Sequence, residues 1–407
     1  MRRVVVTGMG GITSLGSLWP EIKTRLIKKE NAVRYMTEWD MSDDLRTRLG
    51  APVDYFDLPK FSRKETRSMG RVAILSTCAS INALENAGLT DDPKLSDGTT
   101  GIAYGSSSGS IPPINDFSNL LRTGSMAGFN SASYIKMMGH TAPVNMGVYF
   151  GCKGRIITTS SACTSGSQGI GCAYEAIKYG QQDIMIAGGS EEISITQAAV
   201  FDTLFATSTK NDTPELTPRP FDQSRDGLVI GEGAATLILE EYELAKKRGA
   251  TIYAEIVGFG CNSDGAHVTQ PKRETMAVAM ELALKDASLS ADSIGYVSAH
   301  GTATDRGDIA ETQATRKVFD RKVPISSLKS YLGHTLGACG AIEAWLSIEM
   351  MNENWFSPTV NLDNIDQECG DLDYITENER ELNCNYIMSN NFAFGGINTS
   401  LIFKKVN

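Results

Sequence analysis

The chain repeats one pattern, a short apolar strand that runs into a glycine turn. This pattern occurs at residues 4–10 and again at 254–260. Further apolar runs come late in each part of the chain, at 183–189 and 234–239, then at 386–390 and 399–403. Strands that alternate with helix-length segments predict buried, mostly parallel sheets. The repeat therefore predicts an α/β protein built from two similar halves.

The boundary between the halves is expected near residue 250. The charged segment 240–248 is predicted to form a helix that stops at Gly249, because glycine commonly ends helices. No flexible linker follows it. The halves 1–250 and 251–407 should therefore pack as one rigid body, and the strand before residue 163 should correspond to the strand before residue 329.

Cys163 lies among small residues, after the apolar run 156–158 and before a helix predicted over 168–179. A strand, a turn with little bulk and a helix N-terminus, which favours a thiolate, together present a nucleophile. The glycines and alanines of this helix indicate that it is deeply buried. The alternative for a single cysteine is an inert place in the core. Two other sites favour the catalytic interpretation.

Two of the four histidines follow predicted strands. His300 comes after the strand at 296–298, in a loop rich in glycine and threonine, and His334 follows a strand near 325 in a loop that also holds Lys329. Catalytic side chains are often displayed on such loops, and small neighbours leave room for a substrate. A core histidine would more often have bulky apolar neighbours. We therefore assign this pair to a functional site.

Five ordered motifs across the chain resemble the elongating β-ketoacyl-acyl carrier protein synthases, the condensing enzymes of fatty acid and type II polyketide synthesis. They are VVVTGMGGITSLG at 4–16, SSACTSG with Cys163, AHGTATDRGD with His300, LKSYLGHTLGA with Lys329 and His334, and SNNFAFGGINTSLIF with Phe394. The resemblance implies a thiolase-like fold, with duplicated halves in alternating helix and sheet layers (αβαβα). The nucleophile would lie in 1–250 and both histidines in 251–407, with the site between the halves.

The resemblance also implies an acyltransferase reaction. An acyl group would move to Cys163, and decarboxylation of malonyl-acyl carrier protein would then supply the carbon nucleophile that extends a fatty acyl or polyketide chain by two carbons. His300 and His334 would stabilise the enolate. Lys329 and Glu311 would form an ion pair beneath the site, with a solvated surface pair as the alternative. No cofactor and no metal are implied, since the substrates arrive on the phosphopantetheine of the carrier.

The same resemblance implies a set of substrate-binding residues. An oxyanion hole would combine the backbone N–H of Cys163 with one from 394–396, a segment that is otherwise a strand-connecting turn. Two threonines would bind the pantetheine arm, unless their hydroxyls cap the following helix. Small polar residues beside the acyl pocket favour a longer or unsaturated chain, as in an aryl polyene pathway. The expected residues are Phe394, Thr302, Thr304, Ser108, Gly395 and Gly396.

The carriers in such systems are acidic, so this chain needs a locally basic docking surface despite its net charge of −10. Arg63, Lys64 and Arg67 supply one, although a solvated helix face is also consistent with them. We expect either a homodimer or a heterodimer with a chain-length-factor-like homologue. The acidic balance argues against nucleic acid and anionic membranes as partners.

The length of the apolar runs and the spacing of the cysteines bear on the location of the protein and on metal binding. No apolar run reaches the roughly 18 residues that span a bilayer, and the eight cysteines have neither metal-site nor disulfide spacing. We therefore expect a cytoplasmic protein without a metal site.

Three other functions share parts of the pattern. A thiolase needs a second cysteine in the C-terminal glycine-rich motif, where this chain has Asn391, Phe392 and Ala393. Initiating ketoacyl synthases use Cys, His and Asn as their catalytic residues, whereas this chain has Cys163, His300 and His334. A non-catalytic chain-length partner lacks the nucleophile that this chain retains. The catalytic condensing enzyme is the interpretation that the residues favour.

Overall fold

The computed structural model describes residues 1–376 and 380–406, and its centre is an 11-stranded sheet. The first half of the chain contributes β1 (Val4–Thr13), β4 (Thr100–Gly105), β5 (Ile156–Thr158), β6 (Ile184–Glu191) and β8 (Gly233–Glu241). The second half contributes β9 (Ala254–Ser263), β10 (Tyr296–Ser298), β11 (Pro324–Ser326), β13 (Asp373–Tyr374), β15 (Tyr386–Ala393) and β16 (Ile397–Lys404). Smaller sheets are formed by β2 (Arg34–Tyr35), β3 (Leu49–Ala51) and β7 (Ile230–Gly231), and by β12 (Trp355–Phe356) with β14 (Arg380–Glu381).

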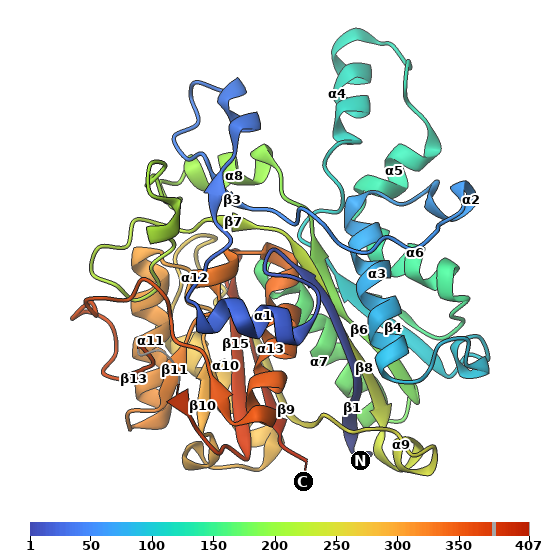
Figure 1. Cartoon of the computed structure of the whole chain (residues 1–407). Coiled ribbons are helices and arrows are strands. Elements are labelled where there is room, and N and C mark those ends of the chain that lie inside the picture. The colour runs from blue at the N-terminus through green and yellow to red at the C-terminus, as the bar shows by residue number, and fades with distance from the viewer. Residues whose placement is uncertain (377–379, 407) are drawn as a thin grey trace.

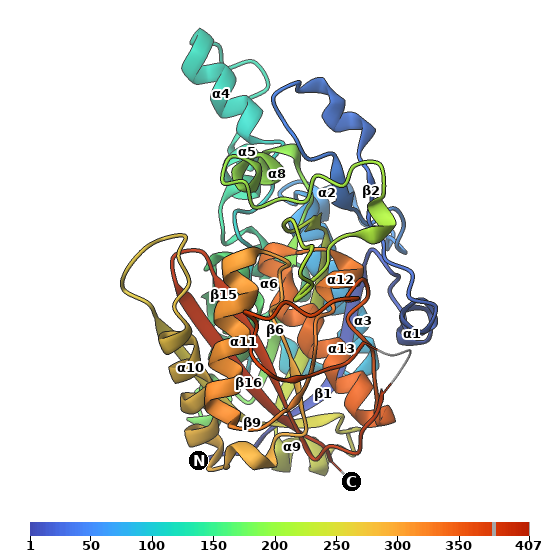
Figure 2. The ribbon, with the colours of Figure 1, turned by 90° about the vertical axis from the view of Figure 1, so that its left-hand side faces the viewer.

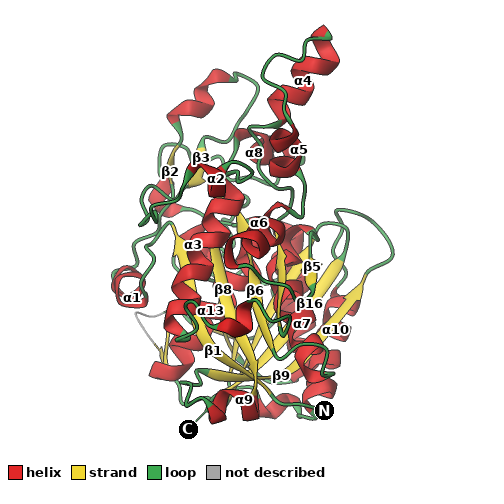
Figure 3. Ribbon diagram, turned by 90° about the vertical axis from the view of Figure 1, so that its right-hand side faces the viewer, coloured by secondary structure: helices red, strands yellow, loops and turns green. Residues whose placement is uncertain are grey.

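The order of the strands is the same in both halves. It is β1-β8-β6-β4-β5 in the first and β9-β16-β15-β10-β11 in the second. The pairings match as well, antiparallel among the first three strands and parallel among the last three. The two sets meet where Val4–Val6 of β1 pairs with β9, and Figure 3 shows the strands fanned between the helices. The predicted duplication is therefore confirmed, and β5 corresponds to β11.

Two expectations about the elements need correction. The sheet is mixed rather than mostly parallel, because β15 and β16 are joined by a tight turn at 394–396 and form an antiparallel hairpin. The helix expected at 240–248 is shorter, since Glu240 and Glu241 belong to β8 and only α9 (Tyr242–Lys247) is helical. The buried Glu240 carboxylate accepts hydrogen bonds from Arg248 and Thr7, which explains a charged residue in a central strand.

Helices complete the alternating layers (Figures 1 and 2). The helices on the outer face of the first half are α3 (Arg71–Asn86) and α6 (Thr141–Phe150). The central layer holds α7 (Ser165–Lys178) and α13 (Cys339–Glu353), and the outer face of the second half holds α10 (Arg273–Ala287) and α11 (Asp305–Phe319). The helix predicted after Cys163 is thus buried as expected, although it begins three residues earlier.

The remaining helices lie at the margins of this core, except the last of them along the chain, whose four residues are all buried. They are α1 (Trp19–Ile27), α2 (Arg63–Thr66), α4 (Ile114–Thr123), α5 (Ser131–Met137), α8 (Ile195–Asp202) and α12 (Lys329–Leu332). Figure 1 shows α4, α5 and α8 above the sheet, with α4 projecting from the body. Among the described residues, no helix has the length and apolar character to cross a membrane.

The N-terminal ends of α7 and α13 come into direct contact in the central layer. A Cβ at Gly166 would lie 2.9 Å from the backbone N of Ala341, and a Cβ at Gly340 would lie 2.8 Å from the backbone N of Ser167. Only glycine at these positions lets the two backbones approach so closely. The duplication therefore brings the turn before α7 and the turn before α13 to one place between the halves.

Candidate active site

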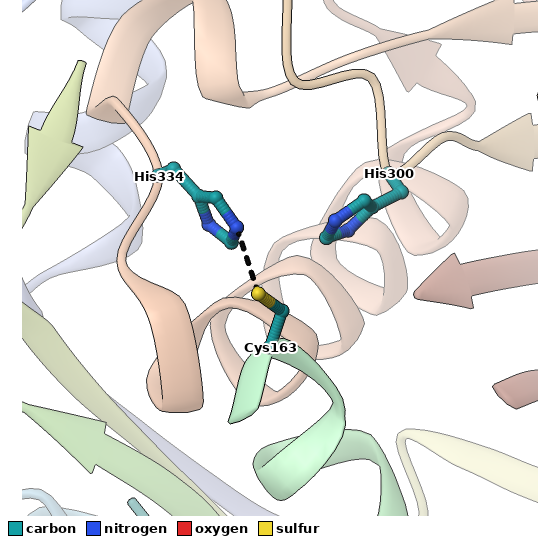
Figure 4. Close-up of side chains that lie close together, drawn as sticks. All are labelled: Cys163, His300 and His334. Atoms are coloured by element: carbon teal, nitrogen blue, oxygen red, sulfur yellow. Dashed lines mark hydrogen bonds between the residues drawn. The ribbon is translucent and has the colours of Figure 1, made fainter. Parts of the chain in front are cut away.

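Cys163 and the two histidines meet between the halves, as Figure 4 shows. The His334 Nε2 atom lies 3.1 Å from the Cys163 Sγ atom. The rings of His300 and His334 are 5.1 Å apart and nearly perpendicular. Exposed fractions of 4%, 6% and 2% for Cys163, His300 and His334 place this group in the interior of the protein. The structure therefore brings together three residues that are up to 171 positions apart in the chain.

The turn that carries Cys163 is held in an unusual backbone conformation. Ala162, directly before the cysteine, has a φ of 51°, and Leu336 has a φ of 43° at the matching position of the turn before α13. Non-glycine residues in this left-handed region are strained by about 1–3 kcal/mol and cluster at functional sites. The two turns, Ala162–Thr164 and Leu336–Ala338, therefore hold the same strained conformation in both halves.

Both histidines are held in the same tautomer by their hydrogen bonds. The Nδ1 atom of His334 accepts from the Leu336 backbone N–H at 3.2 Å. The Nδ1 atom of His300 lies 3.2 Å from the Nζ atom of Lys329, which can only donate. A neutral imidazole that accepts at Nδ1 carries its proton on Nε2. Each histidine can therefore present an Nε2–H donor to a substrate.

Burial keeps all three groups uncharged near neutral pH. It raises the pKa of the Cys163 thiol to about 11, although Lys329 and the backbone N–H groups of Phe394 and Cys163 oppose it. Burial, followed by the charge of Lys329, lowers the pKa of both His300 and His334 well below the usual histidine value. The resting pair is therefore a thiol beside a neutral imidazole. The expected contribution of the helix N-terminus to a thiolate stays a prediction.

The expected ion pair between Lys329 and Glu311 does not form. Lys329 pairs instead with Glu343 of α13, and both side chains are 2% exposed. The Glu311 carboxylate accepts the backbone N–H groups of His300 and Gly301, each at 2.7 Å, and so fastens the His300 loop to α11. Burial raises the pKa of Glu311 to about 8. Glu311 is therefore a support of the loop, while Glu343 neutralises the lysine.

A cavity of about 500 Å³ connects these groups with the surface. Cys163, His300 and His334 form its buried end, and Phe205 and Val268, which are 77% and 66% exposed, lie at its rim. A pocket with a buried reactive end and an open rim suits a substrate that is carried on a long arm.

The family models of the β-ketoacyl synthases match most of the chain. The model of the N-terminal domain matches residues 1–245, and that of the C-terminal domain matches 253–363. The chain belongs to the β-ketoacyl synthase family.

Relatives of known sequence and structure agree with this family. A 3-oxoacyl-[acyl-carrier-protein] synthase 2 of Vibrio harveyi is 37% identical over 417 residues, which cover 100% of this chain and 99% of the relative. The crystal structure of a β-ketoacyl synthase from Burkholderia phymatum STM815 is 61% identical with a TM-score of 0.99, over 100% of both chains. The ishigamide ketosynthase/chain length factor is 28% identical with a TM-score of 0.90, again over 100% of both chains. The fold is the thiolase-like fold that the resemblance implied.

The threonines expected for this ketosynthase line the cavity. The hydroxyls of Thr302 and Thr304 lie 2.8 Å apart on the cavity wall. Thr304 is the residue that precedes α11, but its side chain makes no capping hydrogen bond. The competing role as a helix cap is therefore excluded for Thr304.

In the glycine-rich turn 394–396, Phe394 is better placed than the two glycines to contribute to an oxyanion hole. Hydrogen bonding by the backbone N–H groups of Phe394 and Cys163 lowers the pKa of the Cys163 thiol and so opposes the effect of burial. Gly395 donates its N–H to Val268, and Gly396 donates to Ala393, so neither N–H is free to hold an oxyanion. The Phe394 ring packs against Phe201 at a tilt of 41°, with the centroids 4.9 Å apart.

The other expected residues lie further from the nucleophile. Ser108 is outside the cavity lining, so its place beside an acyl pocket stays a prediction. Lys64 and Arg67 line a separate open groove of about 640 Å³ with Tyr134 of α5. Arg63 and these two residues are exposed and have no ion-pair partner within the described ranges 1–376 and 380–406. Their positive charges are therefore available to a partner.

Three important residues were missed by the sequence interpretation. Glu343 is the single charged residue of the apolar stretch 339–346 in α13, which is the signal that could have identified it. Asn391 donates to Glu343 at 2.7 Å and approaches His300. Glu191 accepts the backbone N–H groups of Ser107 and Gly337 and so links the loops of the two halves. Burial raises the pKa of Glu191 to about 7.

The donor set at the site does not suit a metal ion. One atom each of Cys163, His300 and His334 lies within 4.8 Å of the other two. Ligation through Nε2 would move each imidazole proton to Nδ1, where Lys329 and the Leu336 N–H already donate. These contacts favour proton donors over metal ligands.

Proposed function

We propose that this chain is a β-ketoacyl-acyl carrier protein synthase in which Cys163 carries the growing chain. The observation that supports this most directly is the buried group of one thiol and two Nε2–H donors at the end of an arm-sized cavity. In the first step the Cys163 sulfur attacks an acyl thioester, and its proton leaves with the thiol of the carrier. The oxyanion is held by the N–H groups of Cys163 and Phe394.

The second step is a decarboxylative condensation. A malonyl thioester in the cavity loses CO₂, and the Nε2–H groups of His300 and His334 stabilise the enolate oxygen. The enolate carbon attacks the thioester on Cys163, and the tetrahedral intermediate expels the sulfur. The product is a 3-oxoacyl carrier two carbons longer, and a proton from solvent converts the expelled Cys163 thiolate back to the resting thiol. None of these steps calls for a cofactor.

The alternatives fit the site less well. A thiolase would need a second thiol in the cavity, yet the nearest one, Cys339, donates to the carbonyl of Cys163 and is outside the cavity lining. A non-catalytic chain-length partner would have no use for a nucleophile with both histidines in place. An aryl polyene pathway and a cytoplasmic location stay predictions from the sequence.

The direct test is product formation from carrier-bound substrates. The protein is incubated with an acyl carrier thioester and then with malonyl carrier, and the carrier products are measured by mass. We expect a 3-oxoacyl carrier that is two carbons longer, and none from Cys163→Ala. Product from Cys163→Ala, or an acyl group on another cysteine of the wild-type chain, would contradict the proposal.

We further propose that an acidic acyl carrier protein docks on Arg63, Lys64 and Arg67. Their unpaired charges beside the Tyr134 groove support this. Reversal of all three charges should raise KM for carrier thioesters and leave pantetheine thioesters nearly unaffected, because the small substrates lack the carrier surface. Arg155, Lys247 and Lys317 are exposed residues elsewhere on the chain and offer charges for a matched triple reversal. Equal losses on both substrate types would instead mean that the segment is structural.

A further inference from the structure

We infer that Arg306 binds the phosphate of the phosphopantetheine arm at the rim of the cavity. This inference rests on the proposed use of carrier-bound thioesters. It begins with the geometry of the cavity, which runs from the buried Cys163 to an open rim where Arg306 is exposed. A thioester that reacts at Cys163 must extend its arm outward along this path. The phosphate terminates the arm, so it must lie near the rim.

Arg306 is the one permanent cation among the described lining residues that has no carboxylate partner. The other arginine in the lining, Arg225, is 2% exposed at its side chain and pairs with Asp308 and Asp366. Arg225 also pairs with Asp305, at 3.2 Å, so it neutralises the carboxylate next to Arg306 in sequence. The charge of Arg306 is thus left free to meet an anion.

The remaining carboxylates near the rim are also occupied. Asp226 lies 3.4 Å from the Lys210 ammonium group. Asp264 accepts hydrogen bonds from Asn398 at 2.8 Å and from Thr275. The Glu311 carboxylate holds two backbone N–H groups deeper in the cavity. None of these groups is therefore a ready competitor for Arg306.

The position of Arg306 in α11 is not explained by the stability of the helix. It is the second residue of α11, in the first turn, where the positive end of the helix dipole disfavours a cation. Asp305 and Asp308 supply the acidic residues that this turn prefers. An arginine here is better explained by an anion that approaches from outside. Guanidinium groups bind phosphate oxygens in bidentate fashion, and they hold a charge at every relevant pH.

The nearby threonines place the arm beside Arg306. Thr302 and Thr304 line the cavity between the histidines and the start of α11. A Cβ at Gly307 would lie 2.5 Å from the Thr304 hydroxyl, so the backbone after Arg306 is packed directly against this wall. An arm that follows the threonines therefore leaves the cavity next to Arg306.

The test compares two small thioesters that differ only in the phosphate, acyl-phosphopantetheine and acyl-pantetheine. The rate of Cys163 acylation is measured by mass as a function of thioester concentration, for the wild-type chain, Arg306→Gln and Arg306→Lys. We expect Arg306→Gln to lower kcat/KM about tenfold on acyl-phosphopantetheine, because KM rises. On acyl-pantetheine the loss in kcat/KM should be less than about twofold. Arg306→Lys should keep part of the preference, since lysine remains a point charge.

The control is Lys317→Gln, which removes a charge from the same helix about 16 Å further along. It should leave both rates unchanged. Equal losses on both thioesters in Arg306→Gln would overturn the inference, as would a loss only on carrier-bound substrate, which would assign Arg306 to the carrier surface. Failure of the wild-type chain to accept any thioester would instead overturn the proposed function itself.

Discussion

The hydrogen bonds of single residues decide what each catalytic group can do. His300 and His334 differ in sequence context but share one tautomer, because Lys329 and the Leu336 N–H each occupy an Nδ1 atom. Both rings are therefore donors into the cavity, a property that suits the stabilisation of an enolate. His334 also touches the Cys163 sulfur, whereas His300 does not, so the two histidines should differ in their effect on acylation.

The raised pKa of Cys163 predicts how its reactivity depends on pH. With a thiol pKa near 11, the neutral thiol dominates at pH 7 and the thiolate fraction grows about tenfold per pH unit. The rate of alkylation by iodoacetamide, measured by mass at Cys163, should rise steadily from pH 7 to pH 10. The exposed Cys261 provides an internal reference for a solvent-accessible thiol. A plateau that begins below pH 8 would show that the thiolate is already formed at rest.

The residues of the site were predictable to different degrees. Cys163, His300 and His334 are recognisable because small residues and predicted strands surround them. The partner of Lys329 was not, because the choice between Glu311 and Glu343 depends on which helix faces the lysine. Glu311 is near His300 in sequence, but its two oxygens are engaged by backbone N–H groups. Such competition between partners is visible only in three dimensions.

At the scale of elements, the crossing of α7 and α13 positions the nucleophile. Gly166→Ala would place a Cβ 2.9 Å from the Ala341 backbone N and would push the two turns apart. We expect the free energy of unfolding to fall by about 1–3 kcal/mol. Acylation of Cys163 should slow as well, since the turn at 162–164 must shift. Urea denaturation and single-turnover mass measurement would provide the two values.

Gly249→Ala serves as the control for this prediction. Gly249 has a φ of 71° but open space around its Cβ position. The substitution should cost about 1–2 kcal/mol through backbone strain alone, with no change in acylation. If Gly166→Ala left both stability and acylation intact, the close contact of the two helices would not be what holds the site.

The helices and strands were predicted well where apolar residues and glycines recur at regular spacing in the sequence. The repeated strands and the buried helix after Cys163 follow from apolar runs and glycine spacing. The antiparallel pairs were missed, because an apolar run carries no information on the direction of its neighbour. The projecting α4 was missed too, since all of its residues are at least partly exposed and its stability depends on neighbours such as α5.

For the whole molecule, the free edge of the sheet predicts a dimer. β5 is the last strand of the first half, and no strand in the described part of the chain pairs with its outer edge. Ile156 in β5 and Val148 in the adjacent α6 are 45% and 80% exposed. Unpaired edges with apolar neighbours favour pairing with another chain. We expect light scattering to give a mass of about twice the 43.9 kDa of one chain. This mass should appear either with this chain alone, as a homodimer, or only when a homologous partner subunit is present.

Ile156→Lys tests this dimer directly. A charge on β5 should shift the mass toward that of one chain, because the lysine would be desolvated in the interface. Val278→Lys, a substitution on the exposed face of α10, should leave the mass unchanged. If both variants kept the mass of the wild-type assembly, the interface would lie elsewhere.

The central claim is that Cys163 carries the acyl group while the two histidines serve the condensation. The most direct measurement is a single turnover in two stages, each stage monitored by mass, on the wild-type chain, His300→Ala and His334→Ala. His300→Ala should still be acylated at Cys163 from an acyl carrier thioester, and His334→Ala should be acylated more slowly because it loses the contact with the sulfur. After addition of malonyl carrier, both variants should form product about 10²–10³ times more slowly than the wild-type chain. Complete loss of acylation in folded His300→Ala, or wild-type condensation rates in either variant, would contradict this account.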